Sequence, residues 1–209
     1  MQRSPLHLCC QLSHRSLSVC FVRLHRPLLV ALALLLTLIS SASAQSTSDR
    51  QWVVFRQSDG LASNDVFSIL VQDDAVWIGT ASGVSRYNGR WESFISIIPA
   101  DATLSAAVSL GAVTALAAGN TEGEVWAGDA AGLLVHWRDG AGWAVEEALN
   151  TPIHALVAGD GQLWIGTERG LFLWRNEILT PVEAVGKTPV LTLAYMDGVV
   201  WAGAEQALW

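Results

Sequence analysis

The segment Val76-Trp77-Ile78-Gly79-Thr80 decides the fold, because it recurs three more times without gaps. The other copies are Val125-Trp126-Ala127-Gly128-Asp129, Leu163-Trp164-Ile165-Gly166-Thr167 and Val200-Trp201-Ala202-Gly203-Ala204. Their tryptophans are 49, 38 and 37 residues apart, a period that suits four short strands with their turns. Each copy predicts a strand whose tryptophan packs between neighbouring sheets and whose glycine lets the next sheet approach.

The residues around each copy repeat as well. A first strand is predicted before each copy, over Val66–Val71, Val113–Ala118, Ile153–Ala158 and Val190–Tyr195. It is joined to the tryptophan strand by turn residues, which are Asp73-Asp74, Glu122-Gly123, Asp160-Gly161 and Asp197-Gly198. Glycines that need a positive φ follow the tryptophan strand at Gly83, Gly132 and Gly170. A third strand is then predicted over Val84–Tyr87, Leu133–His136 and Leu171–Trp174.

A fourth strand completes the repeat. It holds Trp91 and Phe94 in one copy, and Trp143 and Val145 in the next. Four strands per repeat without a helix predict an all-β radial array of sheets, in which each sheet is one blade of a β-propeller. A flat sandwich of two sheets would explain the turns, but it would not explain the recurrence of the tryptophan segment without gaps.

Residues 52–89 resemble the two-component regulator propeller repeat. The motifs that carry the resemblance are Trp52-Val53-Val54-Phe55, Asp59-Gly60-Leu61-Ala62-Ser63-Asn64, Val76-Trp77-Ile78-Gly79-Thr80 and Arg86-Tyr87-Asn88-Gly89. The match is also close over 153–174, and looser over 113–140 and 190–209, where Ala207 replaces the expected glycine. The resemblance implies a periplasmic sensor propeller, usually placed before a membrane helix and a histidine kinase or nucleotide cyclase domain.

Residues 1–44 have the features of a secretory signal peptide. Four arginines and no acidic residue precede an apolar run, Leu28–Ile39, and the small-residue site Ala42-Ser43-Ala44 follows it. An uncleaved membrane anchor is the alternative, although the run is shorter than the roughly 20 residues that span a bilayer. Cleavage after Ala44 would leave 8 basic and 19 acidic residues, a net charge of −11, and would remove all three cysteines.

We expect residues 45–209 to form a partial β-propeller of about four blades. The blade repeats are expected at about 66–97, 112–147, 153–185 and 189–209, and residues 51–57 are expected to supply a ring-closing strand. About four blades would make the chain a fragment of a ring of about seven, as the family resemblance implies. A complete ring of four blades is the alternative.

The composition argues against several classes of function. A net charge of −7 disfavours nucleic-acid binding, which depends on lysine and arginine. The sequence contains no G-x-S-x-G, H-E-x-x-H or phosphate-binding glycine loop, so we expect neither catalysis nor a cofactor. His136 and His154 lie in different repeats and are interpreted as strand residues rather than metal ligands. Any kinase or cyclase activity would belong to a part of the protein beyond Trp209.

An insertion makes one spacing irregular. About eleven extra residues lie around Ile98–Gly111, between the first two blades, where loops of repeat proteins commonly build a binding face. Asp101, Thr103 and Ser105 are candidate ligand-binding residues there, unless the insertion is inert surface. Trp137 is a further candidate, because it lies outside the repeat's aromatic register.

The leading hypothesis is an exported ligand-sensing module, periplasmic or extracellular, of a two-component type receptor. Its ligand would be an extracellular carbohydrate or other small molecule, and the receptor could be dimeric. Membrane attachment would come only from an uncleaved leader or from a segment beyond Trp209. A secreted scaffold for protein interaction is the alternative, and a propeller lyase is a third hypothesis.

Overall fold

The computed structural model describes residues 52–98 and 107–209. Apart from one turn of 3₁₀ helix, η1 (Gln57–Asp59), the regular structure there consists of β-strands, so the prediction of an all-β chain is confirmed. None of the described helical structure is long and apolar enough to cross a membrane. The predicted signal peptide lies outside the described residues.

Three antiparallel sheets have four strands each, in chain order. The first sheet consists of β1 (Val66–Gln72), β2 (Ala75–Thr80), β3 (Gly83–Tyr87) and β4 (Trp91–Phe94). The second consists of β7 (Val113–Ala118), β8 (Glu124–Asp129), β9 (Leu133–Arg138) and β10 (Gly142–Ala148). The third consists of β11 (Ile153–Gly159), β12 (Gln162–Thr167), β13 (Gly170–Arg175) and β14 (Ile178–Pro181).

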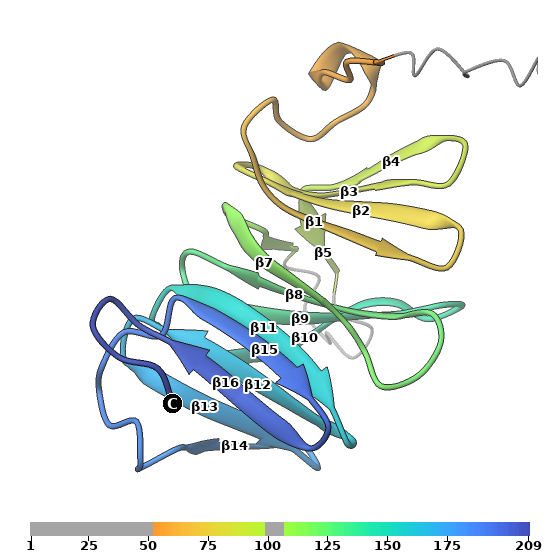
Figure 1. The fold of residues 1–209 in the computed structure, drawn as a ribbon. Helices are drawn as coiled ribbons and strands as arrows, with labels where there is room; N and C mark the ends of the chain where they lie inside the picture. The colour runs from red at the N-terminus through yellow and green to blue at the C-terminus, as the bar shows by residue number, and fades with distance from the viewer. Residues whose placement is uncertain (1–51, 99–106) are drawn as a thin grey trace, which may run out of the picture. The chain divides into compact units, whose positions relative to one another are not determined.

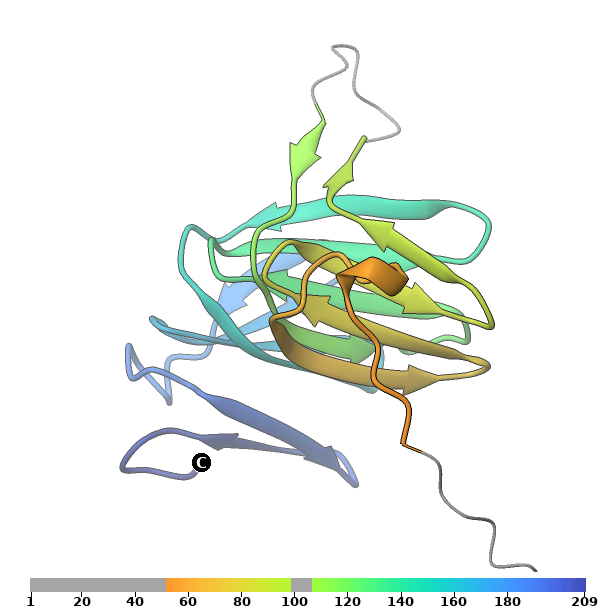
Figure 2. The same ribbon diagram turned by 90° about the horizontal axis from the view of Figure 1, so that it is seen from above.

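The fourth repeat forms a hairpin of β15 (Thr192–Met196) and β16 (Val199–Gly203). Residues 207–209 pair with β16, because Ala202 and Trp209 exchange backbone hydrogen bonds of 2.9 and 3.0 Å. Gly203 and Leu208 form an isolated antiparallel bridge at the same edge of the hairpin. Another short hairpin, β5 (Ser96–Ile97) and β6 (Val108–Ser109), lies between the first two sheets in the chain and beside them in space (Figure 2). Ile97 of β5 is 3% exposed and packs in the core that the two sheets share.

Within residues 54–209 the sheets follow one another through their first strands. β1 contacts β7, β7 contacts β11, and β11 contacts β15 (Figure 1). The repeated tryptophan of each sheet faces the next sheet: Trp77 packs among side chains of the second, Trp126 among those of the third, and Trp164 against the β15–β16 hairpin. Trp77 is 3% exposed, whereas Trp201 of the last hairpin is 45% exposed.

The repeated glycine lies where the next sheet begins. Gly79 lies against the backbone carbonyl of Val113, the first residue of β7. A Cβ at Gly128 would be 2.5 Å from Cγ2 of Ile153, the first residue of β11. Val113 and Ile153 are fully buried, so a side chain at either glycine would displace a packed strand.

The turns explain why the second repeat can deviate in sequence. The Thr80 hydroxyl donates a 2.9 Å hydrogen bond to the carbonyl of Gly83, and Thr167 does the same to Gly170. Asp129 stands at this position in the second repeat, and its carboxylate accepts hydrogen bonds from the backbone of Ala131 and Leu133 instead. The buried carboxylate therefore holds the same turn with a different side chain.

Two sets of turn predictions agree with the backbone. Asp73, Asp160 and Asp197 have φ values of 50–51°, which suits aspartate in a hairpin turn. The glycines predicted to need a positive φ have values of 109° for Gly83, 93° for Gly132 and 114° for Gly170. These turns set the register of the hairpins on either side of each tryptophan strand.

The first described residues do not form a strand. We predict a ring-closing strand over 51–57, but residues 52–56 have no regular structure and η1 begins at Gln57. The closing interaction stays a prediction. Phe55 instead packs on the first sheet, with ring centroids 5.7 Å from Tyr87 and 5.2 Å from Trp91.

Candidate functional site

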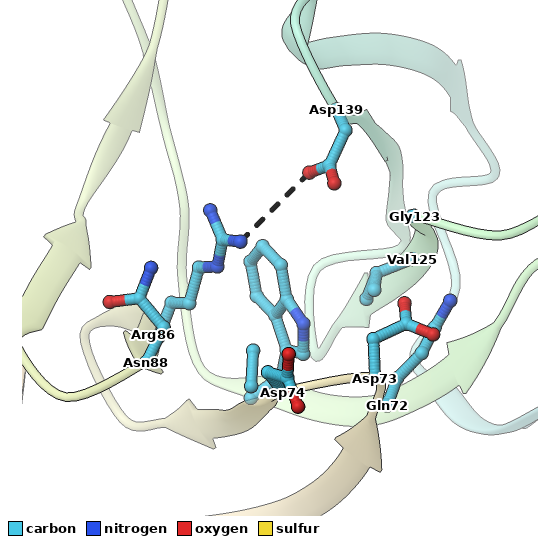
Figure 3. Close-up of a pocket in the computed structure, with 10 residues that line it drawn as sticks. Gln72, Asp73, Asp74, Arg86, Asn88, Gly123, Val125 and Asp139 are labelled. Carbon is cyan, nitrogen blue, oxygen red and sulfur yellow. Dashed lines mark ion pairs between the residues drawn. The ribbon is translucent and has the colours of Figure 1, made fainter.

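A cavity of about 320 Å³ lies between the first and second sheets (Figure 3). Its lining comes from the end of β1 and the β1–β2 turn, from β2, β3 and the turn after β3, and from β8 and two turns of the second sheet. The lining residues are Gln72, Asp73, Asp74, Ala75, Trp77, Arg86, Asn88, Gly123, Val125 and Asp139. Both sheets therefore contribute strand and turn residues, and the strand residues come mainly from the first sheet.

Arg86 is the central cation of this cavity. It lies directly opposite Trp77 in the β2–β3 pairing, and its Cζ is 5.1 Å from the Trp77 ring centroid. The same carbon lies 5.6 Å from the ring of Trp137 in β9. The guanidinium is therefore held by two indole rings through cation–π attraction, and the Arg86 side chain is 20% exposed.

Trp137 lies behind the arginine in an aromatic cluster. The rings of Trp77, Phe94, Trp137 and Trp143 are all within 6.5 Å of one another, centroid to centroid. The indole Nε1 of Trp137 donates a 2.9 Å hydrogen bond to Asp139, whose carboxylate is 4.0 Å from the Arg86 guanidinium. Trp137 therefore contacts both the Arg86 guanidinium, through its ring, and the Asp139 carboxylate, through its N–H.

The cavity has a mixed polar character. Asp73, Asp74 and Asp139 contribute three carboxylates, and Arg86 contributes one positive charge (Figure 3). Two buried atoms of the lining, Oε1 of Gln72 and Nε of Arg86, have no hydrogen-bond partner within the described protein. One is an acceptor and the other a donor, so a ligand that both donates and accepts hydrogen bonds would satisfy them.

Of the four predicted ligand-binding residues, only Trp137 lies in the described part of the chain. Asp101, Thr103 and Ser105 lie outside the described residues. Trp137 contacts Arg86 but does not line the cavity. His136 lies in β9 and His154 in β11, and the described part of the chain has no cluster of three His, Cys, Asp or Glu suited to a metal ion.

Sequence reasoning missed Arg86 as a site residue. It was interpreted only as part of the repeat motif Arg86-Tyr87-Asn88-Gly89. A comparison of the repeats would have found it, because the residue opposite the constant tryptophan changes from Arg86 to His136 to Leu173. A position that varies beside a constant core residue is a signal for a site.

The solved structures most relevant to this arrangement are extracellular domains of proposed hybrid two-component systems from B. thetaiotaomicron. The chain matches that of BT4673 with a TM-score of 0.62 and 25% identity, over 77% of the chain. It matches that of BT3049 with a TM-score of 0.53 and 18% identity, over 78% of the chain. The computationally designed protein Ika4 also matches, with a TM-score of 0.53 and 18% identity over 69% of the chain and 90% of Ika4. The fold is a β-propeller.

The chain covers only a small part of the two-component domains that it matches. The chain spans 23% of the length of each matched two-component domain, so it corresponds to a small group of blades there. No protein-family model and no curated protein matches the sequence. The propeller fold therefore rests on the four repeats, their sheets and the solved structures together.

Proposed function

We propose that this chain is part of an extracytoplasmic sensor propeller of a two-component type receptor, and that it binds a small polar ligand without catalysing a reaction. The observation that carries the proposal is the 25% identity and TM-score of 0.62 to the extracellular domain of BT4673. The repeat motifs of the two-component regulator propeller family and the signal-peptide features of residues 1–44 support it independently.

The cavity between the first and second sheets is the proposed ligand site. Hydroxyl groups donate and accept hydrogen bonds, so a neutral sugar would satisfy both Gln72 Oε1 and Arg86 Nε. The three carboxylates against one guanidinium disfavour an acidic ligand. A neutral carbohydrate of monosaccharide or disaccharide size is therefore the ligand class we propose.

The receptor part of the proposal is tested by the gene and by fractionation. The DNA downstream of the Trp209 codon should encode a membrane span followed by a kinase or cyclase domain. The native protein should fractionate with the periplasm or the membrane. A stop codon directly after Trp209, with no signalling gene beside it and the protein in the cytoplasm, would contradict a sensor role.

The ligand part is tested by isothermal titration calorimetry on the 209-residue chain. Glucose and cellobiose serve as neutral probes, and glucuronate serves as the acidic one. We expect saturable heat with a neutral probe, no heat with glucuronate, and at least a tenfold weaker affinity in the Arg86→Met variant. Arg90→Met is the matched control, because Arg90 is exposed and pairs only with Glu92 among the described residues. Preference for glucuronate, or equal loss in both variants, would contradict the site.

A protein-interaction scaffold is the second candidate function. Phe67, Ile69 and Val71 alternate along β1 and are 54%, 66% and 72% exposed. Alternating apolar residues share one face of a strand, and an exposed apolar face favours contact with another protein. Release of the native protein into the medium, rather than retention at the membrane, would favour this candidate.

A further inference from the structure

A second cavity, of about 270 Å³, lies between the second and third sheets. It occupies the position in the repeat that the Arg86 cavity occupies one sheet earlier. Trp126 and His136 are paired across β8 and β9 as Trp77 and Arg86 are paired across β2 and β3. Because β9 alternates its side chains, Trp137 faces the first sheet and His136 faces the third.

His136 is buried but has no hydrogen-bond partner. Its ring stacks on Trp126 with a centroid distance of 3.9 Å and an interplanar angle of 7°, and the residue is 2% exposed. Neither Nδ1 nor Nε2 is hydrogen-bonded to any described residue, although both are buried. Burial lowers the pKa of His136 to about 4; Arg138 acts in the same direction and Glu124 opposes it. The imidazole is therefore neutral at pH 7 and offers one acceptor nitrogen.

Three charged side chains lie around the imidazole, none of them within normal hydrogen-bond distance of it. Nδ1 of His136 is 3.5 Å from Glu146 Oε1, and Nε2 is 3.8 Å from Glu124 Oε1. Arg138 is 3.7 Å from Glu124 and 3.8 Å from Glu146. Charge-assisted hydrogen bonds are about 2.7–2.9 Å long, so none of these four pairs forms one, and their donors and acceptors stay available to a further polar group that approaches from the cavity.

The cluster lacks one positive charge. Two glutamates face one arginine and a neutral histidine, which gives a local charge of −1. The other charged residues of the lining, Arg175 and Glu177, cancel each other. The side chain of Arg138 is 52% exposed and those of Glu124 and Glu146 are 21% and 17% exposed, so the cluster is open to solvent through the arginine.

We propose that the cavity beside His136 binds the primary ammonium group of a small organic amine. An ammonium group has three N–H donors and one positive charge. Glu124, Glu146 and the unprotonated nitrogen of His136 supply three acceptors, and the cation restores neutrality. Arg138 stays beside the two glutamates, and its exposed guanidinium can also meet an acidic group of the same ligand. The site is independent of the Arg86 cavity and of what binds there.

The proposal is tested by isothermal titration calorimetry on the 209-residue chain at pH 7. The probes are ethanolamine and ethylene glycol, which differ by one ammonium group in place of a hydroxyl. We expect saturable binding of ethanolamine, none of ethylene glycol, and no competition by potassium chloride at the concentration of ethanolamine used. Equal binding of both probes would contradict the ammonium site, as would displacement of ethanolamine by potassium.

Variants locate the site. Glu146→Gln should weaken ethanolamine binding at least tenfold, whereas Glu168→Gln, which changes a carboxylate paired with His154 outside the cavity, should leave it unchanged. Arg86→Met should also leave it unchanged, so failure of the sugar site and failure of the amine site are distinguishable. Equal loss in Glu146→Gln and Glu168→Gln would overturn the proposal.

A spectroscopic readout covers the case in which Glu146→Gln does not fold. In the unmodified chain, ethanolamine should shift the assigned ring carbon-bound proton and carbon NMR signals of His136 and leave those of His154 in place. Ethylene glycol should shift neither. Shifts at His154 alone, or at neither histidine, would overturn the proposal without any substitution.

Discussion

The two cavities share one architecture but differ in the residue that lies opposite the tryptophan and in the charged residues around it. In both, a buried tryptophan on the second strand of a sheet lies opposite a cationic or titratable residue on the third strand, and turns of the next sheet close the space. The first cavity has Arg86, held between two indole rings. The second has His136, stacked on one indole and facing two glutamates.

The difference shows that the residues that pack adjacent sheets together are not the residues that set the chemical character of each cavity. The tryptophan and the glycine two residues later hold adjacent sheets together, and the residue across from the tryptophan is free to vary. In the third sheet that residue is Leu173. The cavity between the third sheet and the last hairpin, of about 360 Å³, is lined mainly by apolar residues, among them Trp164, Leu171 and Ala202. Substitutions at the constant positions should therefore damage the fold, and those at the variable position should change only the local chemistry.

The largest expected effect comes from the constant glycines. Gly79→Val and Gly128→Val should each lower the free energy of unfolding by about 3 kcal/mol or more, because the new side chain meets the first residue of the next sheet. Urea unfolding monitored by tryptophan fluorescence measures this loss. The two losses should be similar, since the two interfaces are built alike.

Gly89→Ala is the control for these variants. Gly89 has no heavy atom within 4 Å of an added Cβ and has a φ of 93°, so alanine should cost about 1–2 kcal/mol of backbone strain and meet no neighbouring atom. If the two valine variants were no less stable than Gly89→Ala, the repeated glycine would not be what lets the sheets approach.

A smaller effect, the change of the free energy of unfolding with pH, should distinguish the second cavity from the first. The pKa of His136 is lowered from 6.5 to about 4, chiefly by burial, so the unfolded chain binds more protons than the folded chain between these values. Stability should therefore fall as the pH falls through this window, by about 2 kcal/mol between pH 7 and pH 5. The residues that line the first cavity include no histidine, so this slope should come from the second cavity.

Urea unfolding at pH 5, 6 and 7 measures the slope, and two variants assign it. His136→Gln should remove most of the loss of stability at low pH. His154→Gln should keep it, because His154 is partly exposed and lies 2.9 Å from Glu168. An unchanged slope in His136→Gln would mean that the imidazole is not held neutral by its burial.

Much of the fold could be predicted because each repeat is built from local signals. The aspartates and glycines of the hairpin turns set φ and hence register, and the tryptophan segment marks the same strand in every copy. The exchange of Thr80 for Asp129 made the second repeat look divergent in sequence. It has little structural effect, because both side chains bond to the same turn.

The cavities could not be predicted in the same way. Arg86 and Asp139 are 53 residues apart in the sequence, and they meet only because adjacent sheets stack. The alternation of a strand predicts that His136 and Trp137 point in opposite directions. It does not say which of them meets the preceding sheet. The aromatic register marked Trp137 as unusual, and the structure explains it as the indole that holds Arg86 against Trp77.

The smallest expected effect concerns the anion beside Arg86. Asp139→Asn removes a charge that lies 4.0 Å from the guanidinium and is 63% exposed, so the ion pair contributes little. The asparagine side-chain oxygen can still accept the hydrogen bond from Trp137 Nε1, which preserves the indole's position. We expect a loss of less than about 0.5 kcal/mol in urea unfolding at low salt, and none at 1 M salt, where surface charges are screened.

Asp139→Leu should cost about 1 kcal/mol more than Asp139→Asn, because it leaves the indole N–H without its acceptor. Equal losses in the two variants would mean that the Trp137 hydrogen bond does not position the ring, and that the cation–π contacts with Arg86 are sufficient to hold it.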